Sequence, residues 1–358
     1  MSEKPKIYTD VSSLTQNNLK NLNPLLSFHW SNLDEKAILS GKSRENSPLK
    51  LVSDPQEAEW FILPMHWTYY LWNGKARMNE AVRLAELAKK NQKKMIVWFR
   101  GDLMPVVPFE NAAVFLPGIV KSIAKPNQQA CPVFIEDPLP NFSQGKIFYR
   151  EKKQKPTIGF CGYAEINRLK VLWSIFKGTQ LNVQSRFGRY DYEAVPVVPA
   201  TVTRAQALKL LAQDSGIETS FIIRDKHCHD QVRKKSLEKG SAAHVFYSNI
   251  LETDYTLCLR GYGNWSYRFY ETLACGRIPV LIDTDCVLPN DSNIDWKKYC
   301  VWVDKSELKQ IGEKIADFHS SLSSEDFIER QISCRRLWEE QLTPEGFMKH
   351  IQDYLEVF

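Results

Sequence analysis

Arg268 and Glu271 are the residues whose types and spacing point most directly to chemistry. They stand three positions apart in a predicted helix, so both project from the same face. A guanidinium can hold diphosphate oxygens by paired hydrogen bonds, and a carboxylate can accept hydrogen bonds from both hydroxyls of a ribose. The pair therefore suits a nucleotide sugar. The alternative is a surface ion pair, which is common at this spacing on solvated helices.

A strand, a loop, a short helix and a second strand surround this pair. Residues 255–259 form a short apolar run typical of a strand, and the turn-forming residues 260–264 follow it. Asn264 or Ser266 is expected to cap the helix, and Gly276 to end it before a strand at 278–282. Ligands of open α/β sheets bind beyond the carboxyl ends of strands, where helix N-termini favour anions. The loop before the helix is therefore the expected anion site.

A known family shares this arrangement of residues. The segment CLRGYGNWSYRFYETLACGRIPVLIDTD, at 258–285, resembles the signature of the exostosin glycosyltransferases, glycosyltransferase family 47. Weaker resemblances lie upstream, in SDPQEAEWFILPMHW at 53–67 and TIGFCGYAEINRLKVL at 157–172. Two positions depart from the family pattern, Arg277 where the family often has Cys and His66 where an aromatic residue is commoner. The residues that match the Ser-x-Arg-x-x-Glu and Gly-x-Ile-Pro-Val motifs are Ser266, Arg268, Glu271, Gly276, Ile278, Pro279 and Val280.

The resemblance implies an α/β protein of the GT-B type, with two Rossmann-like domains whose parallel sheets face each other across a cleft. It also implies sugar transfer with inversion from a nucleotide-sugar donor that the second domain holds. Arg168 is the least certain donor contact, because an exposed helix charge explains it equally well. The expected donor-binding residues are Arg260, Gly261, Ser266, Tyr267, Arg268, Glu271 and Arg168.

Length and patterning agree with two domains. A chain of 358 residues can form two cores of ordinary size, and its alternating strand-like and helical runs favour parallel sheets. A polar, basic stretch ending at Pro156 predicts the boundary. We therefore expect an N-terminal acceptor domain at 1–153, a C-terminal donor domain at 154–342, and a final helix at 343–358 that packs back on the first domain.

Hydrophobic periodicity predicts further elements along both halves. Beyond residue 304 the pattern is helical, with a break at Thr343-Pro344. The predicted strands lie at 60–63, 95–99, 157–161 and 219–223, and the predicted helices at 78–90, 166–176, 204–212 and 241–251.

An inverting transfer needs a base that takes the proton of the acceptor hydroxyl. Asp102 and His66 are the candidates, since each follows a predicted strand of the first domain. Alternatively Asp102 caps a turn, His66 is packed in the core, or the base is a residue that no pattern marks. The aromatic residues Trp67, Tyr69, Tyr70 and Trp72 can stack on acceptor sugars, although core packing is the favoured interpretation.

No metal or other cofactor is expected, although Mg²⁺ stays open because phosphates can complete a weak carboxylate site. Asp283-Thr284-Asp285 spells a motif that other glycosyltransferases use for a metal, but two carboxylates alone bind Mg²⁺ weakly. His227-Cys228-His229 lacks the spacing of a zinc site and is interpreted as a polar loop.

Composition predicts a cytoplasmic protein. No secretory segment opens the chain and no long apolar run follows, so we expect a soluble enzyme or a trimmed form of an anchored one. Its eight Cys lack CxxC spacing and are expected to be free buried thiols. A net charge of +5, with basic residues gathered only at 89–94 and 150–155, is too dispersed for nucleic acid. These two stretches form either a solvated face or a peripheral contact with an anionic inner membrane face.

The leading hypothesis is an inverting glycosyltransferase of polysaccharide biosynthesis. Its expected donor is a UDP-sugar, and its expected acceptor is a glycan or a lipid-linked sugar. One rival is a non-catalytic exostosin-like domain that binds nucleotide or glycan and supports a partner glycosyltransferase. Another is a GT-B sugar-nucleotide epimerase, which acts on the donor without an acceptor.

Overall fold

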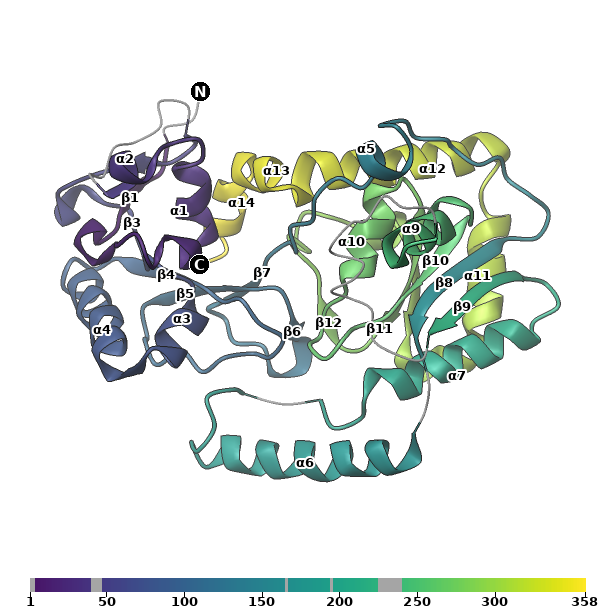
Figure 1. Ribbon diagram of the computed structural model, residues 1–358, viewed down its shortest axis with the longest axis horizontal. Coiled ribbons are helices and arrows are strands. Elements are labelled where there is room, and N and C mark those ends of the chain that lie inside the picture. Colours follow the sequence, from purple (N-terminus) through teal and green to yellow (C-terminus); the bar gives the residue numbers. More distant parts are fainter. Residues whose placement is uncertain (1–3, 40–46, 165–166, 194–195, 225–239) are drawn as a thin grey trace. The chain divides into compact units, whose positions relative to one another are not determined.

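The computed structural model describes residues 4–39, 47–164, 167–193, 196–224 and 240–358 (Figure 1). It contains two compact units. Unit 1 comprises Met1–Pro132, Val287–Asn290 and Phe347–Phe358, and unit 2 comprises Val133–Cys286 and Asp291–Gly346. Each unit has its own parallel sheet, so the predicted α/β class with two Rossmann-like sheets is confirmed. The cleft between them stays a prediction.

Unit 1 is built on a six-stranded sheet whose neighbouring strands all pair in parallel. In spatial order its strands are β2 (Lys50–Leu51), β1 (Lys6–Tyr8), β3 (Trp60–Ile62), β4 (Lys94–Trp98), β5 (Ala112–Leu116) and β7 (Gln128–Ala130). Its helices are α1 (Pro24–His29), α2 (Glu35–Leu39), α3 (Trp67–Trp72), α4 (Gly74–Lys90) and α14 (Ile351–Leu355), and the short strand β6 covers Ile119–Val120.

Aromatic packing ties the end of the chain to this sheet. Phe115, on β5, lies 6.2 Å from Phe347 and 5.5 Å from Phe358 between ring centroids, and Trp98 on β4 lies 5.6 Å from Phe347. Such edge-to-face contacts add to the hydrophobic gain of burying the rings. These contacts explain why Phe347–Phe358 belongs to unit 1 rather than to the helices that precede it.

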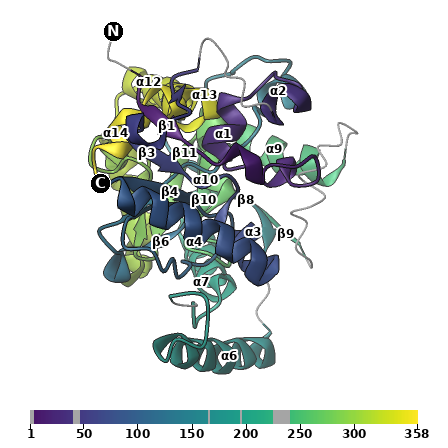
Figure 2. The same cartoon turned by 90° about the vertical axis from the view of Figure 1, so that its left-hand side faces the viewer.

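Unit 2 is built on a five-stranded parallel sheet (Figures 1 and 2). In spatial order its strands are β13 (Val301–Asp304), β11 (Ile278–Asp283), β10 (Tyr255–Cys258), β8 (Thr157–Tyr163) and β9 (Glu218–Arg224). Its helices are α5 (Leu139–Phe142), α6 (Arg168–Arg186), α7 (Ala200–Gln213), α9 (Ala242–Leu251), α10 (Tyr267–Ala274), α11 (Ile311–Ser320) and α12 (Ser324–Leu337). The strand β12 (Cys286–Val287) and helix α13 (Pro344–Lys349) cross from one unit to the other along the chain.

Both sheets reverse their chain order at one point. In unit 1 the first strand lies between β2 and β3, and in unit 2 the strand β8 lies between β9 and β10. The chain therefore adds strands on both sides of the first strand of each sheet. At the point where the order changes, the loops after the two neighbouring strands run in opposite directions. Ligands of open α/β sheets bind at such a switch point. In unit 2 it lies between β8 and β10.

The boundary between the units lies about 20 residues before the predicted one, after Pro132 rather than after Lys153. Residues 133–153 stay with unit 2 because specific contacts hold them there. The Phe142 ring stacks on Tyr247 at 4.4 Å, and Asp137 makes two hydrogen bonds with Arg335. A polar, basic stretch therefore marked a segment bound to one domain, rather than a linker.

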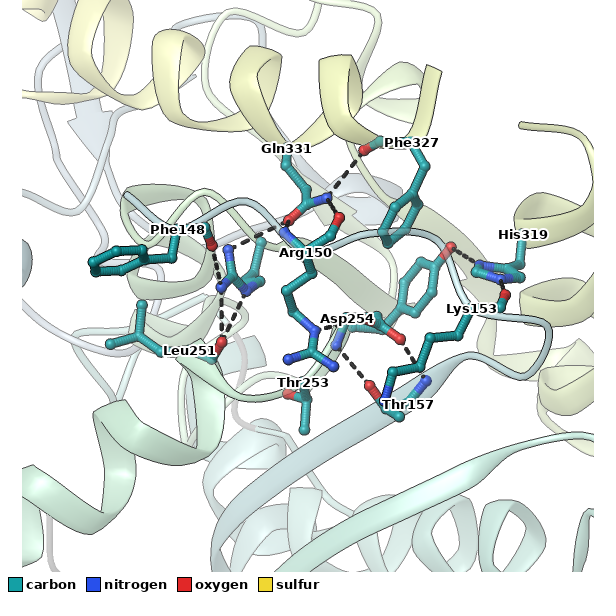
Figure 3. Close-up of polar contacts among 12 residues, drawn as sticks. Phe148, Arg150, Lys153, Thr157, Leu251, Thr253, Asp254, His319, Phe327 and Gln331 are labelled. Carbon is teal, nitrogen blue, oxygen red and sulfur yellow. Dashed lines mark hydrogen bonds and ion pairs between the residues drawn. The ribbon is translucent and has the colours of Figure 1, made fainter. Parts of the chain in front are cut away.

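Figure 3 shows how the basic stretch 150–155 is bound. The Nε of Arg150 donates to the buried carboxylate of Asp254, whose other oxygen accepts from the main-chain N–H of Thr157 at 2.9 Å. Gln331 exchanges two hydrogen bonds with the main chain of Arg150. His319 links the Tyr255 hydroxyl to the carbonyl of Lys153. Structural contacts thus occupy part of this stretch, rather than leaving it a freely solvated basic face.

Arg277, the residue that departs from the family pattern, contacts the same segment. Its side chain is 1% exposed and donates to the carbonyls of Phe148 at 2.9 Å and Leu251 at 2.7 Å. Burial lowers its pKa to about 10, so it stays charged at neutral pH. The long guanidinium joins α9 and α12 of unit 2 to the chain before β8, a role that the shorter Cys side chain has no reach to perform.

The local signals around α10 are largely confirmed. Ser266 is the N-cap residue, although its side chain makes no capping hydrogen bond, and Gly276 ends the helix with a φ of +61°. The predicted break at Thr343 also occurs, where a short π-helix ends before α13. The helix expected at 166–176 is longer, since α6 continues to Arg186. The seven described Cys are free thiols, six of them buried, as predicted. None of the described helices combines the length and apolar character that a membrane crossing needs.

Two buried histidines predict that unit 1 is sensitive to acid. Burial, and to a lesser extent Lys4 for His29 and Arg100 for His66, lowers each pKa from 6.5 to about 4. Between these values the unfolded chain binds more protons than the folded one, so the free energy of unfolding falls as pH drops from 6.5 toward 4. We expect a loss of roughly 1–3 kcal/mol per histidine. Urea unfolding of the chain at neutral and acidic pH measures it.

His66→Asn is the matched variant, because Asn is also a good N-cap residue but does not titrate. It should keep most of the stability at pH 7 and lose less on acidification than the wild type. The same pH dependence in both proteins would contradict the assignment.

Candidate functional site

Four arginines gather beyond the carboxyl ends of three strands of unit 2, and we call them the arginine cluster. Arg224 ends β9, Arg260 follows β10, Arg204 lies on α7 and Arg268 lies in the first turn of α10. Their charges interact. Besides burial, the charges of Arg268 and Arg260 lower the pKa of Arg204, and the charge of Arg224 lowers the pKa of Arg268. The cluster therefore lies at the switch point between β8 and β10.

Arg268 is held against the end of β8. Its Nη2 donates to the Cys161 carbonyl at 2.6 Å, and its guanidinium lies over the Phe160 ring at 4.4 Å. A side chain at position 162 would collide with it, because a Cβ on Gly162 would lie 2.8 Å from that Nη2. The Nε of Arg268 is buried without a hydrogen-bond partner among the described residues. The guanidinium is thus positioned while part of its donor capacity is unused.

Arg204 joins the two strands that flank the switch point. Its Nη1 donates to the Tyr163 carbonyl at 2.7 Å, after β8, and its Nη2 to the Arg260 carbonyl at 3.2 Å, after β10. Arg260 in turn donates to the carbonyls of Gly261, Tyr262 and Val198. Arg204 also has a buried Nε with no partner in the described part of the chain. Main-chain carbonyls therefore fix the cluster in place.

The charge of the cluster is poorly compensated. Burial, and to a lesser extent the neighbouring Arg268 and Arg260, lowers the pKa of Arg204 from 12.5 to about 9. Burial also lowers the pKa of Arg268 and of Arg260. Across the described residues, the hydrogen-bond acceptors of all four arginines are neutral carbonyls, with no carboxylate paired to them. The charge of Glu271 acts on Arg268, but one carboxylate does not balance four guanidiniums. Cations in such excess, which repel one another, favour binding of a polyvalent anion.

Glu271 lies one turn after Arg268 but contacts a different group. The Tyr247 hydroxyl donates to its Oε1 at 3.2 Å, and burial followed by the Glu271 charge raises the pKa of Tyr247. Tyr247 therefore stays protonated and orients the carboxylate. Arg268 and Glu271 are both half-buried, so they do not match the alternative of an ion pair on a solvated helix face. Tyr247 is itself packed against Phe142.

The loop before α10 is held by hydrogen bonds of its own. Gly261 is exposed, and its N–H donates to the Trp265 carbonyl at 3.0 Å. Asn264 bonds to the Thr284 hydroxyl and the Asp285 carbonyl, which ties the loop to the end of β11. Tyr267 packs on Trp265 with ring centroids 4.7 Å apart. The predicted residues Gly261, Ser266 and Tyr267 thus lie on one short segment beside Arg260 and Arg268.

Arg168 stands apart from these contacts. It opens α6, where its side chain is exposed, and Asn167 caps the helix by accepting from the N–H of Lys170. Its role as a phosphate ligand stays a prediction, beside the alternative of an exposed helix charge.

The candidate bases of unit 1 differ in their surroundings. His66 is the N-cap of α3 and its Nδ1 accepts from the Tyr69 N–H at 3.3 Å, which occupies the lone pair that a base would use. Its pKa of about 4 also makes it a weak proton acceptor. Asp102 is exposed and follows β4 at the carboxyl end of the sheet. Asp10 follows β1 and so also lies at the carboxyl ends of the strands, next to the switch point of this sheet. The sequence alone did not identify it as a candidate.

The aromatic run of unit 1 is mostly core. Trp67, Tyr69 and Tyr70 are buried, and the Trp67 Nε1 donates to the Val106 carbonyl at 3.2 Å. Trp72 differs, since 75% of it is exposed. The core interpretation is confirmed for the first three residues.

The two metal-like motifs have different outcomes. Asp283 accepts from the N–H of Cys286 at 2.9 Å, and Asp285 adopts a left-handed φ of +66° in the turn after β11. Within the described ranges, no three His, Cys, Asp or Glu side chains converge in a way that could hold a metal ion. His227-Cys228-His229 lies outside the described residues.

Sequence reasoning missed Arg204, Arg224 and Tyr247. All three lie outside the signature at 258–285, and by spacing each looks like an ordinary helix or strand residue. The one available signal was that Arg224 directly follows the strand predicted at 219–223, the position where α/β sheets present functional groups.

The arginine cluster predicts that inorganic pyrophosphate binds to unit 2. Arg268→Gln should weaken that binding by about 10- to 100-fold, the range for hydrogen bonds to charged groups. Calorimetric titration of the wild type and the variant measures the change. Arg83→Gln, an exposed arginine of α4, is the matched control and should bind as the wild type does. Equal affinity in a folded Arg268→Gln protein would remove Arg268 from the site.

Comparison with known proteins places this site in a family context. A family model described as the Exostosin GT47 domain matches residues 173–317, a range that contains the arginine cluster and Glu271. The chain is 37% identical over 95 residues to exostosin-1 of Drosophila melanogaster, which covers 26% of this chain and 12% of that protein. It is 33% identical over 67 residues to the probable glucuronosyltransferase GUT1 of Oryza sativa subsp. japonica, covering 19% of this chain and 16% of that protein.

Solved structures are more distant. TarM has a TM-score of 0.39 and 9% identity, with 82% of this chain and 54% of TarM covered. Sucrose-phosphate synthase from Thermosynechococcus elongatus has a TM-score of 0.37 and 10% identity, with 99% and 98% covered. The chain spans less than a fifth of the length of the curated relatives it matches. Residues 173–317 match the Exostosin GT47 domain model, and the chain is similar to exostosins over this part of its length.

Proposed function

We propose that the chain is a glycosyltransferase that moves a sugar from a nucleotide sugar to a glycan or lipid-linked acceptor in polysaccharide biosynthesis. The observation that carries the proposal is the arginine cluster beside Glu271, at the switch point of a parallel sheet and inside the family-matched residues. Relatives named as probable glucuronosyltransferases support sugar transfer and make UDP-glucuronate the first donor to try.

The cluster supplies what a departing diphosphate needs. Negative charge grows on the leaving group as the glycosidic bond breaks, and fixed cations in a partly desolvated position stabilise it. Arg204 and Arg268 are already held by carbonyls, so little reorganisation accompanies the reaction. We propose that the four guanidiniums neutralise the leaving charge in this step without a metal.

Glu271 completes the recognition of the nucleotide. Its carboxylate, oriented by the Tyr247 hydroxyl, accepts hydrogen bonds from the ribose diol. The spacing of one helical turn between Arg268 and Glu271 matches the step from phosphate to ribose. We propose UDP as the nucleotide, following the family resemblance.

Inversion requires a base on the opposite side of the donor sugar from the leaving diphosphate. We assign this role to Asp102, which is exposed at the carboxyl end of β4. Its carboxylate takes the proton of the acceptor hydroxyl while that oxygen attacks the anomeric carbon and the diphosphate leaves. His66 is the weaker candidate, because capping occupies its Nδ1.

Glu271→Gln should weaken UDP binding by roughly 1.5–3 kcal/mol, because one acceptor of the diol becomes a donor. Pyrophosphate affinity should stay unchanged, since that ligand has no ribose. Titration with UDP, GDP, CDP and dTDP, without and with Mg²⁺, measures the first effect, and titration with pyrophosphate measures the second. Tyr247→Phe is the matched positioning variant and should lose less, since it frees the carboxylate without removing it.

Two outcomes would count against this assignment. Wild-type affinity for UDP in a folded Glu271→Gln protein would remove the ribose role. Absence of binding by every nucleoside diphosphate would favour the non-catalytic, partner-supporting alternative.

Asp102→Asn should abolish transfer while leaving UDP affinity intact, because it removes the base and not the donor site. His66→Asn preserves the cap of α3 and should retain turnover. Release of UDP from UDP-sugars in the presence of acceptor glycans measures both variants. Retained turnover in Asp102→Asn, with loss in His66→Asn, would reverse the assignment, and loss in neither would direct the search to Asp10.

A further inference from the structure

Helix α6 presents a row of large apolar side chains to solvent. Six of them are between 52% and 78% exposed. They are Leu169, Leu172, Trp173, Phe176 and Val183 within the helix and Phe187 at its C-cap. A soluble helix usually turns such residues toward a core, and a large exposed apolar patch marks an interaction surface.

These side chains lie on a single face. At about 100° per residue, the six positions fall within an arc roughly 100° wide along the helix. Gly178 lies on the opposite face, where a Cβ would meet the Val197 Cα at 3.1 Å. The inner face of α6 is therefore fixed by close approach to residues 196–197, and the apolar arc points away from that contact. In both views α6 runs apart from the other helices of unit 2 (Figures 1 and 2).

Basic residues border the arc on both sides. By the same geometry Lys170 and Lys177 flank one edge, and Arg168 and Arg186 flank the other. The sequence of α6 contains no Asp or Glu. Lys177 lies over the Trp173 ring at 5.4 Å, with its charged end at the border of the apolar face. Long basic side chains beside a Trp, Phe and Leu face are typical of helices that lie in a membrane interface.

We propose that α6 binds an anionic lipid surface, with its apolar arc inserted among the acyl chains and its four basic residues on the headgroups. Lipid is favoured because the helix combines an apolar arc with basic residues on both borders and no acidic residue, which matches the acyl chains and the anionic headgroups together. A copy of α6 would also meet its own like charges. The inference does not depend on the proposed function, since α6 lies outside the arginine cluster.

Sedimentation of the full chain with vesicles tests the proposal, using phosphatidylcholine alone or mixed with phosphatidylglycerol. The wild type should bind the anionic vesicles, and raising the salt concentration should weaken that binding. Replacing both Leu172 and Phe176 by Ser should weaken it by about tenfold or more, since two inserted side chains are lost. Replacing both Lys170 and Lys177 by Glu should remove the preference for anionic vesicles.

Lys75 and Lys90, both exposed on α4, provide the matched charge control. Replacing both by Glu makes the same change in net charge and should leave vesicle binding at the wild-type level. Circular dichroism and thermal unfolding of every α6 variant verify that the chain is folded, a control that does not depend on the proposed function. The proposal is overturned if the wild type binds neither kind of vesicle or if the Ser variant binds as the wild type does. It is also overturned if lipid-free light scattering shows that the Ser variant breaks up an oligomer while vesicle binding is unchanged.

Discussion

Guanidinium groups packed side by side repel one another, and unit 2 holds four of them at the switch point of its sheet. Arg204 and Arg268 keep their places because the carbonyls at the ends of β8 and β10 accept their hydrogen bonds. Carbonyls fix position but supply only partial negative charge, so the field of the cluster remains available to an anion. The order of the strands, the absence of a side chain at Gly162 and the short loop before α10 all serve to bring these cations together.

At the amino ends of the strands of the same sheet, charged groups are paired with groups of opposite charge. There the buried Asp254 is paired with Arg150 and accepts from the Thr157 N–H. Arg277 and Gln331 bind the segment that enters β8, at the carbonyl of Phe148 and the main chain of Arg150. The amino ends of the strands are therefore satisfied internally, whereas the cations at the carboxyl ends have neutral acceptors. This difference agrees with a sheet whose strands are held by internal contacts at their amino ends and bind a ligand at their carboxyl ends.

The sequence predicted the elements around the signature well, because several independent signals coincide there. Apolar strand runs, a capping position and a glycine with left-handed φ at Gly276 all agree. Arg268 and Glu271 were found by spacing on one helix. Arg204 and Tyr247 could not be found that way, because the folding of α7 and α9 onto the sheet brings them to the site. The short strands β1, β2, β7 and β13 also escaped, since two to four residues give too little periodicity to recognise.

The boundary between the units shows a different failure. Residues 150–155 have the composition of a linker, but tertiary contacts to Asp254, Gln331 and His319 bind that segment to unit 2. The composition of a segment describes only the segment itself. It cannot show contacts with partners that lie more than 90 residues further along the chain.

The central claim is that the arginine cluster and Glu271 divide the recognition of one nucleotide between phosphate and ribose. A crystal structure of the chain with UDP tests it most directly. The account predicts diphosphate oxygens within hydrogen-bond distance of the Arg204 and Arg268 guanidiniums, with the ribose hydroxyls on the Glu271 carboxylate. A nucleotide seated elsewhere, or bound with its diphosphate directed away from the arginines, would contradict the account.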